Sequence, residues 1–213
     1  MKHTFKRFTV GLGLAMGAVW VGAGSPSAGP ILAAGTDPSS AVRSDGLSAA
    51  VADCEALPTT DFTTIQDAPA QVTAARVVDA TGDVPTHCRA EGYVSPNVGI
   101  VLRLPGSSDW NGNFLEASLG GYGGSTEDSA PWCEEALRRG YACITHDTGH
   151  TGIGSRASWA YNNLQAEFDY GIRGHHVAAL AGKAITEHYY GRAPEFSYHV
   201  GCSGGGKQGM VEA

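Results

Sequence analysis

The sequence predicts an α/β fold in which a mostly parallel sheet is flanked by helices. Short apolar runs bounded by Gly or Pro alternate along the chain with longer segments of helical periodicity. This alternation is typical of a parallel sheet with helices on its faces. Of the 213 residues, 42% are hydrophobic, which is enough for a buried core and argues against a disordered chain.

Five strands are expected. The run 98–104 carries apolar residues at alternate positions and ends at Pro105-Gly106, as a strand followed by a turn does. The run 141–145 has the composition of a buried strand. The expected strands are 71–80, 98–104, 114–119, 141–145 and 196–200.

Two helices are expected. Residues 131–139 suit a helix that has Gly140 as its C-terminal cap. A longer helix is expected at 173–190, because its apolar residues fall on one face, and Gly191 ends it. The residues on that face are Val177, Leu180, Ala181, Ala184, Ile185 and His188.

Residues 1–23 have the pattern of a signal peptide, with a basic start, an apolar stretch and small residues before the cleavage site. The apolar stretch at 8–21 is shorter than the roughly 20 residues of a membrane span, so no stable membrane anchoring is expected. Residues 24–47, rich in Gly, Ser, Pro and Ala, are expected to form a flexible leader, and 48–213 the folded domain. The protein is therefore expected to be secreted or periplasmic.

Charge and cysteine content narrow the possible functions. A formal net charge of −7 argues against nucleic acid or an anionic membrane surface as the main partner. In an exported protein the five cysteines are expected to form disulfides rather than act as catalytic thiols. Cys54 can pair with Cys88, and Cys133 with Cys143, which leaves Cys202 without a partner.

The segment Gly201–Gly205 matches the G-x-S-x-G nucleophile elbow and stands between an apolar strand and a plausible helix. Ser203 is therefore the candidate nucleophile. The N-terminus of the following helix presents free N–H groups to a developing negative charge, so the Gly204 amide is one candidate oxyanion donor. The second donor is expected in the glycine-dense loop after the third strand, at Gly121 or Tyr122.

Other interpretations of this motif stay open. G-x-S-x-G occurs by chance in glycine-rich chains, and a non-catalytic binding domain could retain such a turn. Residues 201–207 also fit the phosphate-binding pattern G-x-x-x-x-G-K, but that pattern needs Ser or Thr next, where this chain has Gln208. An exported protein also meets little ATP, so the nucleotide interpretation is disfavoured.

The chain resembles the tannase and feruloyl esterase family, which also includes the enzyme that hydrolyses mono(2-hydroxyethyl) terephthalate. The resemblance extends from about Cys54 to Ala213, and its most specific part is the Cys-Ser pair inside the elbow. The matching segments are 110–114, 120–124, 136–142, 145–150, 169–173, 183–185, 189–191 and 201–209.

The resemblance implies an α/β-hydrolase fold and an acyl-enzyme formed on Ser203. In this family the cysteine before the serine is bonded to another cysteine beside the catalytic histidine, which implies a downstream partner for Cys202. The implied substrate is a small ester of an aromatic acid, such as a gallate, a hydroxycinnamate or a terephthalate monoester. Gly204 and Lys207 stand where the family usually has Thr and Arg, which leaves the subfamily and the substrate open.

A reactive serine needs a histidine base oriented by a carboxylate, and α/β-hydrolases carry them in the order serine, acid, histidine. The ten residues after Ser203 contain neither histidine nor aspartate, and Glu212 is interpreted as a solvated surface charge. The fold is therefore expected to be incomplete at its C-terminus, with later strands, the acid, the histidine and a lid domain to follow. In this family the lid commonly binds calcium. The chain as given is expected to have little or no esterase activity and to fold poorly, because its sheet exposes an unpaired edge.

The upstream histidines are not expected to replace the missing base, and a structural hydrogen bond is the preferred interpretation of each. His146 and His150 are four residues apart, but a Thr-Gly loop separates them instead of a helical turn, so no metal site is expected. No cofactor is expected in this segment, and the oligomeric state is left open. The alternative function is a non-catalytic exported paralogue that binds phenolic ligands. The remaining histidines considered are His175, His176 and His199.

Overall fold

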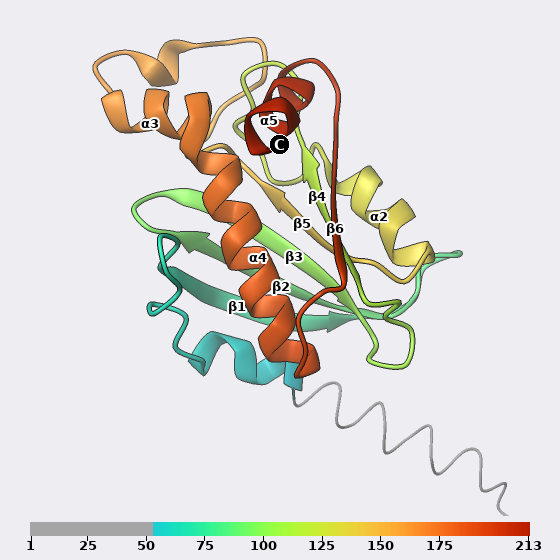
Figure 1. Ribbon diagram of the computed structural model, residues 1–213. Coiled ribbons are helices and arrows are strands. Elements are labelled where there is room, and N and C mark those ends of the chain that lie inside the picture. The colour runs from blue at the N-terminus through green and yellow to red at the C-terminus, as the bar shows by residue number, and fades with distance from the viewer. Residues whose placement is uncertain (1–52) are drawn as a thin grey trace, which may run out of the picture. The chain divides into compact units, whose positions relative to one another are not determined.

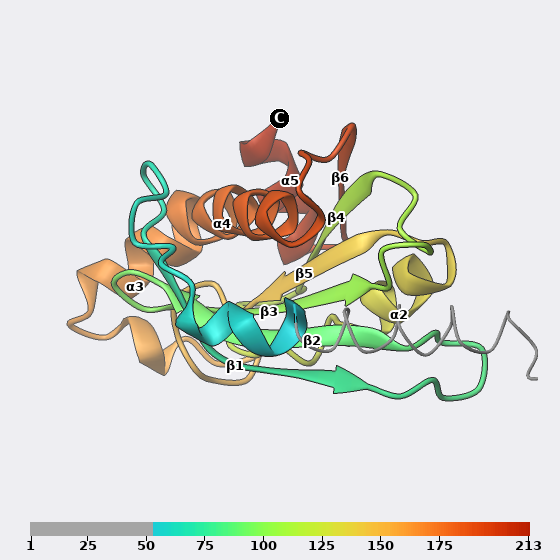
Figure 2. The same ribbon diagram turned by 90° about the horizontal axis from the view of Figure 1, so that it is seen from below.

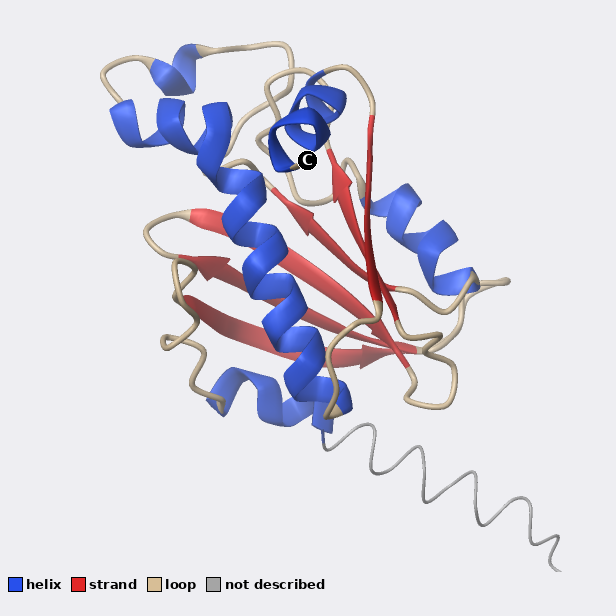
Figure 3. Ribbon diagram, viewed as in Figure 1, coloured by secondary structure: helices blue, strands red, loops and turns tan. Residues whose placement is uncertain are grey.

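The computed structural model describes residues 53–213, and the predicted signal peptide (1–23) and leader (24–47) lie outside the described residues. A six-stranded sheet has the order β1-β2-β3-β5-β4-β6, with helices beside it (Figure 3). All five predicted strands are present, and a sixth, β2, was not predicted. The strands are β1 (Ala70–Val78), β2 (His87–Val94), β3 (Val98–Pro105), β4 (Asn113–Ser118), β5 (Ala142–His146) and β6 (Phe196–Gly201).

The prediction of a mostly parallel sheet is wrong. Strands β1, β2, β3 and β5 pair antiparallel in succession, and only β4 is parallel to its two neighbours, β5 and β6. A parallel pair needs a crossover of a dozen or more residues, and the connections from β1 to β2 and from β2 to β3 are shorter than that. Strand β2 escaped prediction because Arg89, Glu91 and Gly92 interrupt its apolar pattern.

The two predicted helices are confirmed to within one residue as α2 (Ala130–Arg138) and α4 (Gly174–Tyr190). Gly140 and Gly191 follow them with φ of +77° and +70°, a left-handed conformation that ends helices and that glycine adopts without strain. No helix among residues 53–213 is long and apolar enough to cross a membrane. The other helical segments are η1 (Leu57–Thr59), η2 (Ser158–Ala160), α3 (Leu164–Phe168), the π-helical turn η3 (Asp169–Arg173) and α5 (Gly204–Glu212).

Helix α4 lies along one face of the sheet and forms the main core with it (Figures 1 and 2). Gly182 permits the close approach, because a Cβ there would lie 2.7 Å from Phe114 Cζ. Burial of each large apolar side chain in such a core contributes about 1.5–3 kcal/mol. The buried residues that meet at this face include Ile100, Leu102, Phe114, Ile144, Val177, Ala181 and Ile185.

Helix α2 packs against the opposite face. Successive side chains of a strand point to opposite faces, so Ile144 belongs to the α4 core whereas Cys143 belongs to a second buried cluster. That second cluster is small and consists of Ala117, Cys133, Ala136 and Cys143.

Disulfides were expected, and the structure decides the pairing that the sequence left open: both of the pairs that the sequence allowed are formed. Cys133–Cys143 joins α2 to β5, and Cys54–Cys88 joins the segment before β1 to β2. In the chain-entropy account, a disulfide that closes a loop of about 15 residues contributes about 3 kcal/mol by restricting the unfolded chain. The Cys54–Cys88 bond therefore fixes the segment before β1 to the sheet, and the Cys133–Cys143 bond fixes α2 to the sheet.

The carboxyl group of Asp147, directly after β5, joins the loop that follows β5 to the start of β3. Its Oδ1 accepts hydrogen bonds from the N–H groups of Gly99 at 3.0 Å and Gly149 at 2.7 Å. Burial nevertheless outweighs these hydrogen bonds and raises the pKa of Asp147 to about 6. The folded protein therefore holds this proton more tightly than the unfolded chain does.

We predict that the free energy of unfolding falls as the pH rises from about 4 to about 6, because the folded state binds the Asp147 proton up to the higher pKa. Asp147→Asn keeps the Oδ1 acceptor and removes the buried charge. It should raise the free energy of unfolding at pH 8 by roughly 1–2 kcal/mol and change it little at pH 4. Urea unfolding at both pH values measures this, with the exposed Asp79→Asn as control; an equal effect of Asp147→Asn at both values would contradict it.

Candidate active site

Ser203 stands at the turn between β6 and α5. Because β6 ends at Gly201 and α5 begins at Gly204, only two residues make the turn from strand to helix. Ser203 has φ +56° and ψ −114°, a backbone conformation that costs of order 1–3 kcal/mol for a residue with a side chain. An exposed serine with such strain in a strand–turn–helix has the geometry of a nucleophile elbow.

Glycines allow the elbow to pack directly against the end of β4. A Cβ at Gly201 would lie 2.6 Å from the carbonyl carbon of Gly205. A Cβ at Gly205 would lie 2.7 Å from the carbonyl oxygen of Ser118. Neither neighbour is a flexible side chain that could move aside, so the backbone contact itself requires both outer glycines of the motif.

The glycine-dense loop after β4 lies beside Ser203. A Cβ at Gly120 would be 3.9 Å from the Cβ of Ser203, and a Cβ at Gly204 would be 2.3 Å from the carbonyl oxygen of Gly121. The structure thus brings Ser203, Gly204 and Gly121 together, although Gly121 is remote from the other two in sequence.

The candidate oxyanion donors are two backbone amides at this junction. Gly204 is the first residue of α5, so its N–H has no carbonyl partner within the helix. The prediction that Tyr122 could supply the second amide is not supported, because the Tyr122 N–H donates to the carbonyl oxygen of Gly154 at 2.8 Å. The N–H of Gly121 has no acceptor among residues 53–213, which leaves Gly121 as the candidate.

Tyr170 and Lys207 hold this loop against α5. The Tyr170 hydroxyl donates to the Gly121 carbonyl at 3.1 Å. The Lys207 ammonium donates to the carbonyl oxygens of Tyr170 at 2.6 Å and Gly171 at 3.2 Å, and it lies 4.1 Å from the centre of the Tyr170 ring. The lysine that a phosphate-binding loop would use is therefore engaged with the protein's own carbonyl groups.

An aromatic cluster flanks the same loop. His150 stacks on Trp159 with ring centres 3.7 Å apart, and Tyr170 lies 5.3 Å from Trp159. Tyr122 completes the cluster at 5.8 Å from Tyr170. Sequence reasoning missed two of these as site residues: Trp159 lies in a segment without a periodic or motif signal, and Tyr170 lies in the matching segment 169–173, which was given no role. Aromatic side chains of this kind can contact a flat ligand by stacking.

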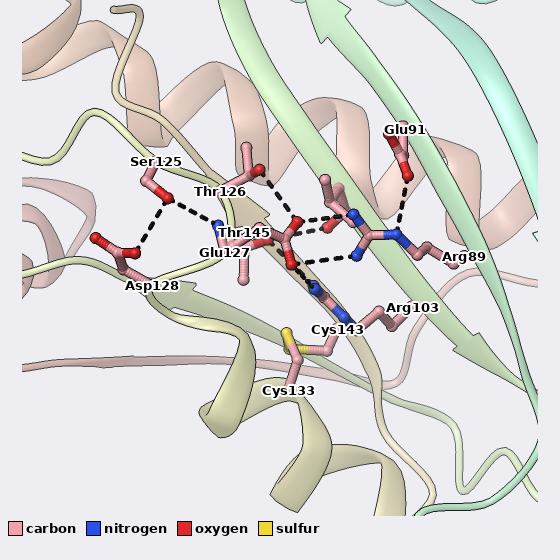
Figure 4. A network of polar contacts seen from close by, with 11 residues as sticks. Arg89, Glu91, Arg103, Ser125, Thr126, Glu127, Asp128, Cys133, Cys143 and Thr145 are labelled. Carbon is pink, nitrogen blue, oxygen red and sulfur yellow. Dashed lines mark hydrogen bonds and ion pairs between the residues drawn. A yellow bond between two sulfur atoms is a disulfide. The ribbon is translucent and has the colours of Figure 1, made fainter. Parts of the chain in front are cut away.

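Glu127 anchors the segment that follows the loop (Figure 4). Its carboxylate accepts hydrogen bonds from Arg89 of β2 at 2.7 Å and from Arg103 of β3 at 3.1 Å. Arg103 is buried and also donates to the Thr145 hydroxyl at 3.3 Å. A buried guanidinium needs such partners, so this network fixes the start of α2 to the antiparallel half of the sheet.

A buried carboxylate, Glu116 of β4, lies beneath the elbow. Its Oε1 is 3.2 Å from His146 Nε2, and its Oε2 is 3.2 Å from His199 Nδ1. The hydrogen bond of His146 Nε2 is to the Ser118 hydroxyl at 3.2 Å, so among residues 53–213 the Glu116 side chain is hydrogen-bonded only by His199. Burial alone would raise the pKa of Glu116, but the interactions with the two histidines outweigh burial and lower the pKa to about 2. Sequence reasoning missed Glu116, although an acidic residue inside an apolar strand is a signal of a buried ion pair.

The other histidines differ in their surroundings. His175 does not fit the interpretation of a structural hydrogen bond, because both of its ring nitrogens are buried without a hydrogen-bond partner among residues 53–213. His175 is fully buried, and burial lowers its pKa to about 4. His176 pairs with Glu212 at 3.0 Å, so the interpretation of Glu212 as a purely solvated charge is wrong. Among residues 53–213 no side chain hydrogen-bonds to the Ser203 hydroxyl. No group of three or more His, Cys, Asp or Glu side chains in this described part could hold a metal ion.

Residues 80–213 match the family model described as "Tannase and feruloyl esterase". The chain belongs to this family. An esterase of Xanthomonas campestris pv. campestris is 33% identical over 172 residues, which are 78% of this chain and 29% of that protein. The mono(2-hydroxyethyl) terephthalate hydrolase of Piscinibacter sakaiensis is 31% identical over 164 residues, which are 65% of this chain and 26% of that enzyme. The crystal structure of feruloyl esterase B from Aspergillus oryzae matches with a TM-score of 0.58 and 27% identity, over 75% of this chain and 33% of that one.

The chain therefore spans a third or less of the length of these tannase and feruloyl esterase relatives. One departure from the family pattern has a structural reason in this chain. Where threonine was expected, Gly204 is required by the loop, since a Cβ would meet the Gly121 carbonyl oxygen at 2.3 Å. Cys202 is exposed and forms no disulfide within residues 53–213.

We predict that Gly205→Ala displaces the elbow, because the new Cβ would lie 2.7 Å from a backbone oxygen of β4. In the protein as its gene encodes it, the substitution should lower the free energy of unfolding by about 1–3 kcal/mol and reduce labelling of Ser203 by a fluorophosphonate. Gly206→Ala is the matched control, because its nearest neighbour would be 3.8 Å away. That control should be neutral or stabilising by about 0.5–1 kcal/mol, since alanine favours helix. Equal effects of the two substitutions would contradict the packing argument.

Proposed function

We propose that this protein is a serine esterase of the α/β-hydrolase type that cleaves esters of small aromatic acids, with Ser203 as its nucleophile. One observation carries the proposal: Ser203 has a strained φ of +56° at a strand-to-helix turn, next to the amides of Gly204 and Gly121. Strain of this kind persists only where the surrounding structure enforces it, and it is concentrated at active sites. Membership of a family of ester hydrolases supports the same reaction class.

In the proposed reaction, Ser203 Oγ attacks the ester carbonyl carbon while its proton passes to a histidine base. The carbonyl oxygen becomes an oxyanion that accepts hydrogen bonds from the Gly204 and Gly121 amides, with the positive end of the α5 dipole behind them. The intermediate collapses to an acyl-enzyme, and the histidine returns the proton to the departing alcohol. Water activated by the same histidine then releases the acid and restores Ser203.

We assign the histidine and its acid partner to positions outside residues 53–213, because none of the described histidines hydrogen-bonds to Ser203. Cys202, exposed beside the nucleophile, is the proposed disulfide partner of a cysteine next to that histidine. Residues 1–213 on their own should therefore have little or no esterase activity.

The substrate and the location of the enzyme follow from different observations. Two relatives, a mono(2-hydroxyethyl) terephthalate hydrolase and a feruloyl esterase, have names that describe esters of aromatic acids. The aromatic cluster of Tyr122, His150, Trp159 and Tyr170 flanks the proposed oxyanion loop and is suited to stacking against such acids. The two disulfides favour an oxidising compartment, so we propose that the protein is secreted or periplasmic.

We predict that Ser203→Ala, in the protein as its gene encodes it, lowers kcat/KM for ethyl ferulate, methyl gallate and mono(2-hydroxyethyl) terephthalate by about 10⁴-fold or more, because no other group can form the acyl-enzyme. Ser197→Ala, which changes an exposed serine of β6, the strand before the elbow, should leave kcat/KM unchanged. Intact mass after fluorophosphonate treatment should show one adduct in the wild type and none in Ser203→Ala. Binding of ferulate without turnover or labelling in the wild type would instead support the non-catalytic alternative.

A further inference from the structure

Beneath the elbow, His199 connects three elements of the structure. It lies on β6 directly opposite Glu116 of β4 in the parallel register. Its Nδ1 is 3.2 Å from Glu116 Oε2, and its Nε2 is 3.0 Å from the carbonyl oxygen of Gly205, the second residue of α5. The ring thus joins the buried carboxylate of the sheet to the first turn of the helix that follows Ser203.

The contacts of His199 define its protonation state. A carboxylate oxygen and a carbonyl oxygen are both acceptors only, so each ring nitrogen must carry a hydrogen to make its contact. Only the imidazolium form has two N–H donors. In the neutral ring one of the two contacts would place a nitrogen lone pair against an oxygen lone pair at 3.0–3.2 Å. The charge is balanced by Glu116, whose side chain is only 3% exposed.

The ring also has little freedom to move. A Cβ at Gly209 of α5 would lie 2.7 Å from His199 Cδ2, so the helix backbone covers the imidazole closely. The His199 side chain is 18% exposed, so solvent competes only weakly for its hydrogen bonds. The ion pair therefore contacts the first turn of α5, which directly follows Ser203 and includes the Gly204 amide.

We propose that His199, held as an imidazolium between the Glu116 carboxylate and the Gly205 carbonyl, is a positioning residue that keeps the nucleophile elbow in its active geometry and limits activity at alkaline pH. This inference rests on the proposed role of Ser203. When His199 loses a proton, one contact becomes repulsive and the first turn of α5 is released from β4. A displacement of about 1 Å at a nucleophile can lower the rate about 100-fold, so a small shift is sufficient.

The charged surroundings favour the imidazolium form. Burial by itself lowers the pKa of His199, but the hydrogen bond and charge of Glu116, the Gly205 carbonyl and the charge of Glu212 outweigh burial and raise the pKa. The titratable groups around this cluster are Glu116 from β4, His146 from β5, His175 and Lys183 from α4, and Lys207 and Glu212 from α5.

The test compares kcat and KM over pH 5–9 for the wild type, Glu116→Gln and His199→Gln in the protein as its gene encodes it. Glu116→Gln removes the counter-charge, so its alkaline fall in kcat should begin at lower pH, with kcat about 10-fold below the wild type at pH 8 and within about 2-fold at pH 6. His199→Gln keeps one N–H donor for Gly205 but cannot ionise, so kcat should be about 10-fold lower at pH 6 without an alkaline fall of its own. KM should change less than about 2-fold in both, because the pair does not touch substrate.

A control variant tests whether the effect is specific to His199, and a spectroscopic measurement tests the protonation state of His199 directly. His176→Gln removes a half-exposed histidine of α4 that pairs with Glu212 of α5, and it should leave the pH profile unchanged. Nitrogen-15 spectra of the histidine rings should show both His199 nitrogens protonated at pH 7 in the wild type and the loss of this state at lower pH in Glu116→Gln.

If both variants keep the wild-type alkaline limb while fluorophosphonate still labels Ser203, the positioning role is wrong and the proposed nucleophile stands. A neutral His199 ring at pH 7 would overturn the inference in the same way. If the wild type is not labelled at Ser203, the proposed function fails, and this inference fails with it.

Discussion

The contact between two backbone segments, the elbow turn and the end of β4 with its glycine loop, is the constraint on which the rest of the site depends. Gly201, Gly204, Gly205 and Gly121 lie where any Cβ would meet a main-chain atom at less than 3 Å. Ser203 has its unusual φ at this contact, and the backbones of Gly121 and Gly204 lie against each other beside it. Side chains then act from outside the junction to hold it, because the junction itself has no room for them.

The antiparallel and parallel halves of the mixed sheet have different roles in supporting the site. The antiparallel strands β1 to β3 need only short connections, and the Cys54–Cys88 disulfide and the Arg–Glu127 network fasten them to the elements around them. The parallel strands β4, β5 and β6 end at the same edge, where the glycine loop, the Asp147 loop and the elbow meet. Sites of α/β sheets form at the carboxyl ends of parallel strands, and here three such strands suffice to build one.

The buried carboxylate of Glu116 beneath the elbow is balanced by two histidines. A carboxylate inside the sheet is unfavourable unless it is paired, and Glu116 is paired by His146 and His199. A hydrophobic pair at these positions could pack as well, but it would make no directed contact with the Gly205 carbonyl. The ion pair that compensates the buried charge of Glu116 also contacts α5 through the Gly205 carbonyl. In the proposed role of His199, its protonation therefore affects the geometry at Ser203.

The sequence by itself determined the features whose physical cause is local. Short apolar runs located five strands, the glycines after α2 and α4 marked their ends, the G-x-S-x-G motif located Ser203, and the cysteines of a chain with a signal-peptide pattern indicated disulfides without deciding their pairing. Only the tertiary structure decided the strand directions, the pairing of β2, the occupied Tyr122 amide and the Glu116–His199 contact. Each of these depends on a partner far away in sequence, and neither periodicity nor a motif specifies which distant residue will satisfy a hydrogen bond or a buried charge.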